Sequence, residues 1–151
     1  MHWKSWLVVA AFVGVCMIAA HSRSTRSGHT PQRFPTRLVQ PGPLPALWIF
    51  ARADCVHCRR HLQALQRAAR GLPDSVRAQA CARVHVASDL QLQACGCGHP
   101  LALQRQLGIR GTPLTWWVAA DTSIQRAWRG ARDEAAWTRA LSFLLDPEST
   151  P

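Results

Sequence analysis

Two cysteines three positions apart, Cys55 and Cys58, stand where an apolar segment gives way to a segment with helical spacing. Residues 47–51 are uniformly apolar, as in a short buried strand, and apolar residues after Cys58 recur every three or four positions. The first turn of a helix presents unpaired backbone N–H groups and the positive end of the helix dipole, which favour a thiolate. We therefore predict a reactive dithiol, with Cys55 as nucleophile, Cys58 one turn behind it and Asp54 as the helix N-cap.

The N-terminus has the three-part pattern of a secretory signal. A positive head with Lys4 precedes an apolar run over residues 6–20, and small residues follow it. The run is short for a membrane span, which needs about 20 apolar residues, so residues 1–22 are assigned to a signal peptide or an N-terminal membrane anchor. Cys16 is interpreted as part of the apolar core of that signal. The expected location is the periplasm, or the inner membrane facing it.

Composition changes after the signal. Residues 23–45 are rich in proline, serine and arginine and hold few large apolar side chains. Such a segment does not bury enough surface to fold alone, so we expect a basic linker there. The folded domain is expected over residues 46–147, with a short tail at 148–151.

The net charge of +10 comes almost wholly from arginine, because Lys4 is the only lysine. The arginines do not form a stripe with interleaved aromatic residues, so we expect no nucleic-acid partner. A basic surface that favours acidic or membrane neighbours is the simpler interpretation.

Within the domain, apolar strands alternate with amphipathic helices. Proline or glycine stands near the ends of most segments, which limits their length. Strands are predicted at 47–51, 83–87, 114–119 and 124–128, and helices at about 55–70, 100–107 and 133–145. Strand, helix, strand, helix, strand, strand, helix is an α/β order.

A second motif lies at residues 107–113 and ends in Gly111-Thr112-Pro113. A strand, Cys-x-x-Cys and a helix, followed about 55 residues later by Gly-Thr-Pro and another strand, resemble the thioredoxin superfamily, and within it the secreted Dsb thiol:disulfide interchange proteins. The resemblance implies a thioredoxin-like fold, with a central mixed sheet flanked by helices and a cis-proline loop at Pro113. It also implies that an extended substrate binds alongside Thr112 and Pro113.

Individual residues resemble different branches of that family. Thr112 before the proline and a second set of cysteines between the two motifs resemble the catalytic domain of the disulfide isomerases DsbC and DsbG. His57, in a Cys-x-His-Cys centre, instead resembles the oxidase DsbA, in which a histidine stabilises the thiolate. Val56 stands where that oxidase has proline, and the isomerases' dimerisation domain has no room before residue 46. We expect a monomer. The sequence leaves open whether it oxidises, reduces or isomerises its substrates.

The activity implied by the resemblance is protein-disulfide oxidoreduction without a cofactor. Cys55 attacks a substrate disulfide, or a substrate thiol attacks the oxidised pair, and Cys58 resolves the mixed disulfide. The expected partners are cysteine-containing exported proteins and a membrane or periplasmic redox protein. The alternatives are a non-catalytic thioredoxin-like adaptor and an assembly factor of a secretion or conjugation apparatus.

Three further cysteines, Cys81, Cys95 and Cys97, leave their pairing open. A structural disulfide from Cys81 to either Cys95 or Cys97 closes a loop of about 15 residues and stabilises by about 3 kcal/mol. Alternatively, Cys95 and Cys97 form a second redox pair. Mass mapping distinguishes the two arrangements.

A structural zinc-binding domain is the competing chemistry, because Cys55, Cys58, Cys95, Cys97 and His99 supply enough ligands. An oxidising compartment and the Gly-Thr-Pro motif argue against it, so we expect no metal.

The remaining histidines and tryptophans are interpreted as packing residues. We expect His61 to cover the surface of its helix, and His85 has no visible partner. Trp116 and Trp117 are adjacent on a predicted strand, so they face opposite sides and at least one packs in the core. A tryptophan exposed near Pro113 is a candidate contact for substrate.

Overall fold

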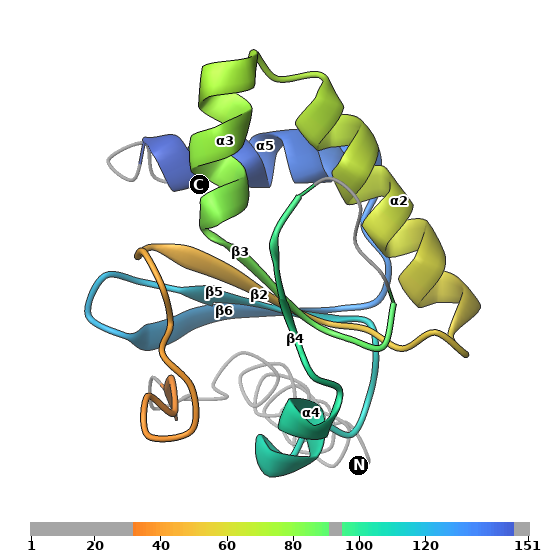
Figure 1. Ribbon diagram of the computed structural model, residues 1–151, viewed down its shortest axis with the longest axis vertical. Helices are drawn as coiled ribbons and strands as arrows, with labels where there is room; N and C mark the ends of the chain where they lie inside the picture. Colours follow the sequence, from red (N-terminus) through yellow and green to blue (C-terminus); the bar gives the residue numbers. More distant parts are fainter. Residues whose placement is uncertain (1–31, 91–94, 147–151) are drawn as a thin grey trace, which may run out of the picture. The chain divides into compact units, whose positions relative to one another are not determined.

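The computed structural model describes residues 32–90 and 95–146 (Figure 1). Its centre is a six-stranded sheet in the order β1-β6-β5-β2-β3-β4. The strands are β1 (Gln32–Arg33), β2 (Ala46–Phe50), β3 (Val84–Ala87), β4 (Cys97–His99), β5 (Leu114–Val118) and β6 (Ser123–Arg129).

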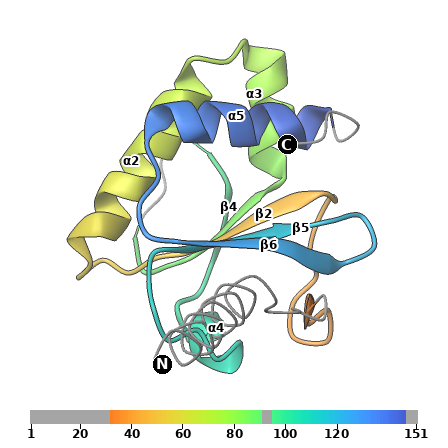
Figure 2. The ribbon, with the colours of Figure 1, turned by 180° about the vertical axis from the view of Figure 1, so that it is seen from behind.

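Helices cover both faces of this sheet. Figures 1 and 2 show α2, α3 and α5 on one face and the short α4 on the other. Their bounds are α2 (Val56–Arg70), α3 (Asp74–Ala82), α4 (Ala102–Gln106) and α5 (Glu134–Leu145). In the part of the chain that is described, no helix has both the length and the apolar character that crossing a membrane requires.

The sheet is mixed. β2 runs parallel to β3 and antiparallel to β5, β3 runs parallel to β4, and β5 forms an antiparallel hairpin with β6. Every residue of β2 is buried, as expected for a central strand covered on both faces. This arrangement is the thioredoxin-like α/β fold that the sequence predicts.

The alternation of side chains along the strands creates two cores. Leu47 and Ile49 of β2 pack with α2 and α5, whereas Trp48 and Phe50 pack on the opposite face with Trp116. The last of these is buried and its neighbour Trp117 packs partly against the helical core, so the two tryptophans face opposite sides as predicted.

The folded unit begins earlier than the boundary expected at residue 46. Phe34, from the segment assigned to the linker, is 3% exposed and its ring lies 4.8 Å from that of Trp48. The adjoining strand β1 pairs with Ser123 and Ile124 of β6. The boundary was misplaced because the average composition of residues 23–45 does not reveal one aromatic side chain that packs on the sheet.

Besides β1, two further elements were not predicted. The helix α3 is short and largely polar, so its apolar spacing is weak. The strand β4 has only three residues, one of them glycine, and forms an edge of the sheet. α3 lies between α2 and β3 in sequence, and β4 follows β3 and positions Cys97 beside His85 of β3.

Candidate active site

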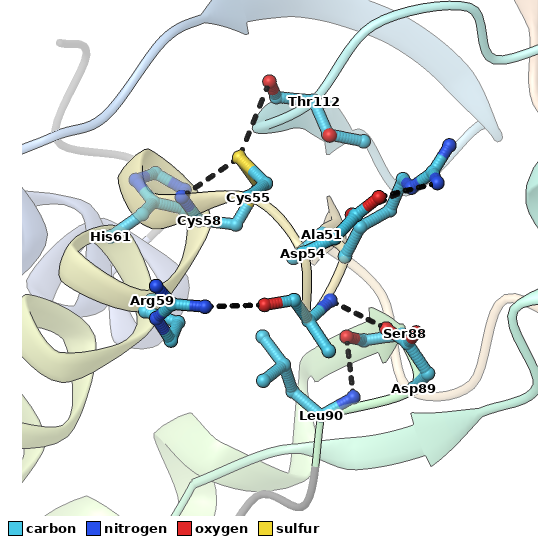
Figure 3. Close-up of a disulfide and its surroundings, with 12 residues drawn as sticks. Ala51, Asp54, Cys55, Cys58, Arg59, His61, Ser88, Asp89, Leu90 and Thr112 are labelled. Atoms are coloured by element: carbon cyan, nitrogen blue, oxygen red, sulfur yellow. Dashed lines mark hydrogen bonds and ion pairs between the residues drawn. A yellow bond between two sulfur atoms is a disulfide. The ribbon is translucent and has the colours of Figure 1, made fainter.

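The dithiol lies at the N-terminus of α2 as a disulfide between Cys55 and Cys58, whose Cα atoms are 5.2 Å apart (Figure 3). Cys55 itself is the N-cap, because its Sγ accepts a hydrogen bond of 3.1 Å from the backbone N–H of Cys58. Asp54 was expected in that role, but its carboxylate is bound by Arg52 through two contacts of 3.0 and 2.7 Å. The helix terminus therefore directs an N–H group at the sulfur, where it stabilises negative charge.

The loop that precedes the dithiol is fixed from two sides. The backbone N–H of Ala53 donates to Asp89 Oδ1 at 2.7 Å, and its carbonyl accepts from Arg59 Nη1 at 2.6 Å. Figure 3 shows Arg59 to the left and Asp89 to the right of the segment that they hold. These contacts hold Cys55 in place without covering it.

The two sulfurs differ in accessibility. Cys58 is fully buried, whereas Cys55 is half-buried and Val56 beside it is 46% exposed. An incoming thiol or disulfide therefore reaches Cys55 first, which fits the predicted order of nucleophile and resolving cysteine. His57 is exposed on the same first turn, and within residues 32–90 and 95–146 no hydrogen bond or ion pair of its side chain is found.

The Thr112 loop lies directly against the dithiol. The carbonyl oxygen of Thr112 is 3.8 Å from Cys55 Sγ, and the Thr112–Pro113 peptide bond is cis. Pro113 is buried and its carbonyl accepts from Gly130 N–H at 2.9 Å. The fold thus brings together the two motifs that are about 55 residues apart in sequence.

His61 is fully buried behind the dithiol, so the expected surface position is wrong. Its Nδ1 accepts from the backbone N–H of Arg132 at 2.9 Å, so Nε2 carries the proton and donates to Thr115 Oγ1 at 3.1 Å. Its backbone carbonyl accepts from Trp137 Nε1 at 3.1 Å. Burial, and secondarily the positive charge of Arg132, lower the pKa of His61 to about 4, so the ring is neutral at pH 7. One side chain thereby joins α2, β5 and the loop before α5.

Cys81 pairs with Cys95, with Cα atoms 4.8 Å apart, and joins α3 to the segment before β4. Cys97 is free and exposed. Cys95 packs in the helical core. Cys97 is the register partner of His85 and shares its face of the sheet, which is the opposite face, where the His85 ring stacks on Trp48. The structural pairing is therefore the one formed, and Cys95 and Cys97 point to opposite faces of the sheet.

No group of three or more potential metal ligands gathers among residues 32–90 and 95–146. Three of the cysteines considered as zinc ligands form disulfides instead, since Cys55 bonds Cys58 and Cys95 bonds Cys81.

His85 does have a partner, which sequence spacing did not suggest. Its Nδ1 lies 3.1 Å from His99 Nε2, and its ring stacks on Trp48 with centroids 4.6 Å apart. Burial, and then the neighbouring His99, lower the pKa of His85 to about 4, and burial also lowers the pKa of His99. This pair lies on the α4 side of the sheet and is separate from the dithiol.

Two residues that support the site were missed. Asp89 accepts from the backbone N–H of Ala53 in the loop before Cys55, a contact between residues 36 positions apart. Gln104 is buried and its amide donates to the carbonyls of Ala51 and Ala87, both at 2.7 Å, which ties together the ends of β2 and β3. A glutamine between Leu103 and Leu107 in an apolar helical pattern is a weak signal for such a buried donor.

No protein-family model matches the chain, and no curated protein does. Among solved structures, the chain is similar to StoA from Bacillus subtilis, with 12% identity over 62% of this chain and 79% of that one and a TM-score of 0.45. It is also similar to a thioredoxin-family thiol:disulfide interchange protein from Chlorobium tepidum TLS, with 15% identity, coverage of 66% and 79% and a TM-score of 0.46. For the N-terminal domain of PilB from Neisseria gonorrhoeae the values are 18%, 70%, 78% and 0.43. These are distant likenesses, and the assignment of the fold depends on the topology of the sheet.

Proposed function

We propose that the protein is a thiol:disulfide oxidoreductase that acts, through Cys55 and Cys58, on disulfides and thiols of exported proteins. One observation carries the proposal: a half-buried sulfur at a helix N-terminus is bonded to a fully buried one and lies 3.8 Å from the Thr112 carbonyl. This arrangement exposes one reactive sulfur next to a backbone edge that an extended polypeptide can approach. The export signal assigned to residues 1–22 supports a periplasmic location and a periplasmic or membrane redox partner.

In the oxidising direction, a substrate thiolate attacks Cys55 Sγ. A mixed disulfide between substrate and Cys55 forms, the Cys55–Cys58 bond breaks, and Cys58 leaves as a thiolate that takes up a proton. A second substrate thiolate then attacks the substrate sulfur, which releases a substrate disulfide and leaves Cys55 as a thiolate. The reducing direction is the reverse of these steps. In both, two electrons pass between the protein and the substrate, and the N–H of Cys58 stabilises the charge on Cys55.

His57 is proposed to assist Cys55 when it is protonated, because it stands exposed on the same helical turn. The thiolate absorbance of the reduced protein measures this contribution. Cys55 is expected to titrate below the ordinary thiol value of about 8.5, and its pKa is expected to rise in His57→Ala. An unchanged titration in His57→Ala assigns the stabilisation to the helix terminus alone.

The decisive test is exchange with a dithiol peptide, followed by acid quenching, alkylation and mass measurement. Cys55→Ser is expected to abolish exchange, and Cys58→Ser to accumulate a mixed disulfide at Cys55. Cys97→Ser is the matched control, because it removes an exposed thiol outside the site. Failure of the wild-type protein to exchange, with retained binding of the peptide, contradicts the proposal and supports the adaptor. Equilibration of the Cys55–Cys58 couple with glutathione gives the direction of electron flow.

A further inference from the structure

Two exposed arginines, Arg110 and Arg129, adjoin the Thr112 loop. Arg129 Nη1 lies against Gly111, since a Cβ at that glycine would come within 3.6 Å of it. Arg110 directly precedes the same glycine in the chain. Thr112, the next residue, has its carbonyl 3.8 Å from Cys55 Sγ. The Arg129 guanidinium and the backbone of Arg110 therefore adjoin the loop whose Thr112 carbonyl lies next to the reactive sulfur.

We call Arg110 and Arg129 the arginine rim. A third arginine, Arg132, stands apart from them. It lies over the ring of Trp128 at 4.5 Å from its centroid, and Trp128, next to Arg129 on β6, packs against the helical core on the other face of the strand.

The charges of Arg110 and Arg129 are not neutralised within the described part of the protein. Three ion pairs are found there, Arg52 with Asp54, Arg67 with Glu134 and Arg77 with Asp74. Neither of the two arginines belongs to one of these pairs, although both stand on the loop and strand next to the dithiol. Unpaired guanidinium groups at a reactive site are suited to carboxylates supplied by a partner.

We propose that the arginine rim binds an acidic segment of the protein partner, so that the preferred substrates carry Asp or Glu beside the cysteine that reacts with Cys55. The inference rests on the proposed function and names its substrate class. A polypeptide fits this surface better than a nucleic acid does, because the rim borders a sulfur that reacts with cysteine and the backbone of Thr112.

The preference for acidic substrates is measured in the first half of the exchange reaction. A peptide thiolate attacks Cys55 of the oxidised protein, the peptide–Cys55 disulfide forms, and Cys58 departs as a thiolate and is protonated. No other oxidant is needed, because the Cys55–Cys58 disulfide accepts the electron pair.

The experiment uses the full chain and three peptides that differ only in the residues flanking one cysteine: glutamate, glutamine or lysine. Flanking charge also changes the reactivity of the peptide thiol, so each rate is divided by the rate of the same peptide with the neutral 2-hydroxyethyl disulfide. The normalised second-order rate is expected to be roughly tenfold higher for the glutamate peptide than for the lysine peptide. The preference is expected to shrink at about 1 M salt, where the screening length is about 3 Å.

Charge reversal locates the preference. Arg110→Glu with Arg129→Glu is expected to remove or invert it, and Arg110→Gln with Arg129→Gln to remove it. The matched control is Arg37→Glu with Arg70→Glu, which reverses two exposed arginines. Arg70 ends α2, about 22 Å along the helix from Cys55. The control is expected to retain most of the preference, and unfolding midpoints show that each variant is folded.

The outcomes separate the two proposals. Equal normalised rates for all three peptides overturn the acidic preference and leave the oxidoreductase proposal intact. Absence of reaction with every peptide overturns both. If the Arg37 and Arg70 control loses the preference equally, the net charge of the protein alone causes the preference, and the proposed role of the arginine rim is contradicted. A single-stranded oligonucleotide and an acidic, cysteine-free peptide are also compared as competitors of the glutamate peptide. Equal inhibition by both at the same concentration contradicts the choice of a polypeptide.

Discussion

Acid is expected to destabilise this protein through His61. The neutral ring fills a fully buried position, in which Nδ1 accepts from the N–H of Arg132 and Nε2 donates to Thr115. A second proton on Nδ1 would break the bond to Arg132 and place a positive charge in the core beside that arginine. The native state therefore resists protonation, and the unfolded chain does not.

The magnitude follows from the two pKa values. The unfolded chain takes up the proton near pH 6.5, whereas the native protein does so near pH 4, and this difference corresponds to about 3 kcal/mol. The contribution is complete above pH 6.5 and is lost as the pH falls towards 4, with about 2 to 3 kcal/mol gone at pH 4.5. That is a large part of the 5 to 15 kcal/mol that usually separates native and unfolded states.

Urea unfolding at about pH 7 and pH 4.5 measures the loss, with His61→Gln as the test variant. Glutamine keeps an acceptor and a donor but does not titrate, so the stability of His61→Gln is expected to fall by about 2 to 3 kcal/mol less than that of the wild type over this interval. His85, whose pKa is also lowered to about 4, contributes to both proteins and cancels in the difference. His57→Gln, at an exposed position of the same helix, is the matched control. If His61→Gln keeps the wild-type dependence on pH, the buried neutral ring is not the cause.

Three further predictions concern packing, covalent structure and surface charge. Phe34→Ala is expected to lower the free energy of unfolding by about 3 to 4 kcal/mol, because the ring is buried against Trp48, whereas Leu38→Ala at a 51% exposed position should cost less than about 0.5 kcal/mol; equal losses in urea titrations would contradict the early boundary of the domain. Cys81→Ala with Cys95→Ala is expected to cost about 3 kcal/mol while the rate of exchange at Cys55 stays unchanged, and a parallel loss of exchange would show that the second disulfide takes part in the reaction. Arg67→Gln is expected to cost less than about 1 kcal/mol, since its pair with Glu134 is exposed, and a larger loss in thermal or urea unfolding would show that the pair does more than a surface contact.

Hydrophobic periodicity predicted the elements that carry the dithiol. The apolar run of β2, the helix α2 and the β5–β6 hairpin have patterns long enough to be distinctive. The proximity of Cys55 and Thr112 was inferred from a family resemblance, and the structure places Cys55 Sγ 3.8 Å from the carbonyl oxygen of Thr112. In these elements local pattern and tertiary structure agree.

The failures have a different physical origin. His61 is polar, so its burial depends on partners from Thr115 and Arg132, which are distant in sequence. Asp54 has a strong preference for the N-cap, but Arg52 binds its carboxylate and the sulfur of Cys55 takes its place. Contacts of this kind are set by tertiary packing, which residue preferences do not encode.

β6 connects two distant regions of the domain. Its first residues pair with β1, and its last residue, Arg129, lies against the Thr112 loop, about 20 Å further along the strand. The chain therefore enters the domain at Gln32, at the end of the sheet away from the reactive sulfur. An attachment at Gln32 would therefore lie at the far end of the sheet from Cys55 and leave the dithiol uncovered.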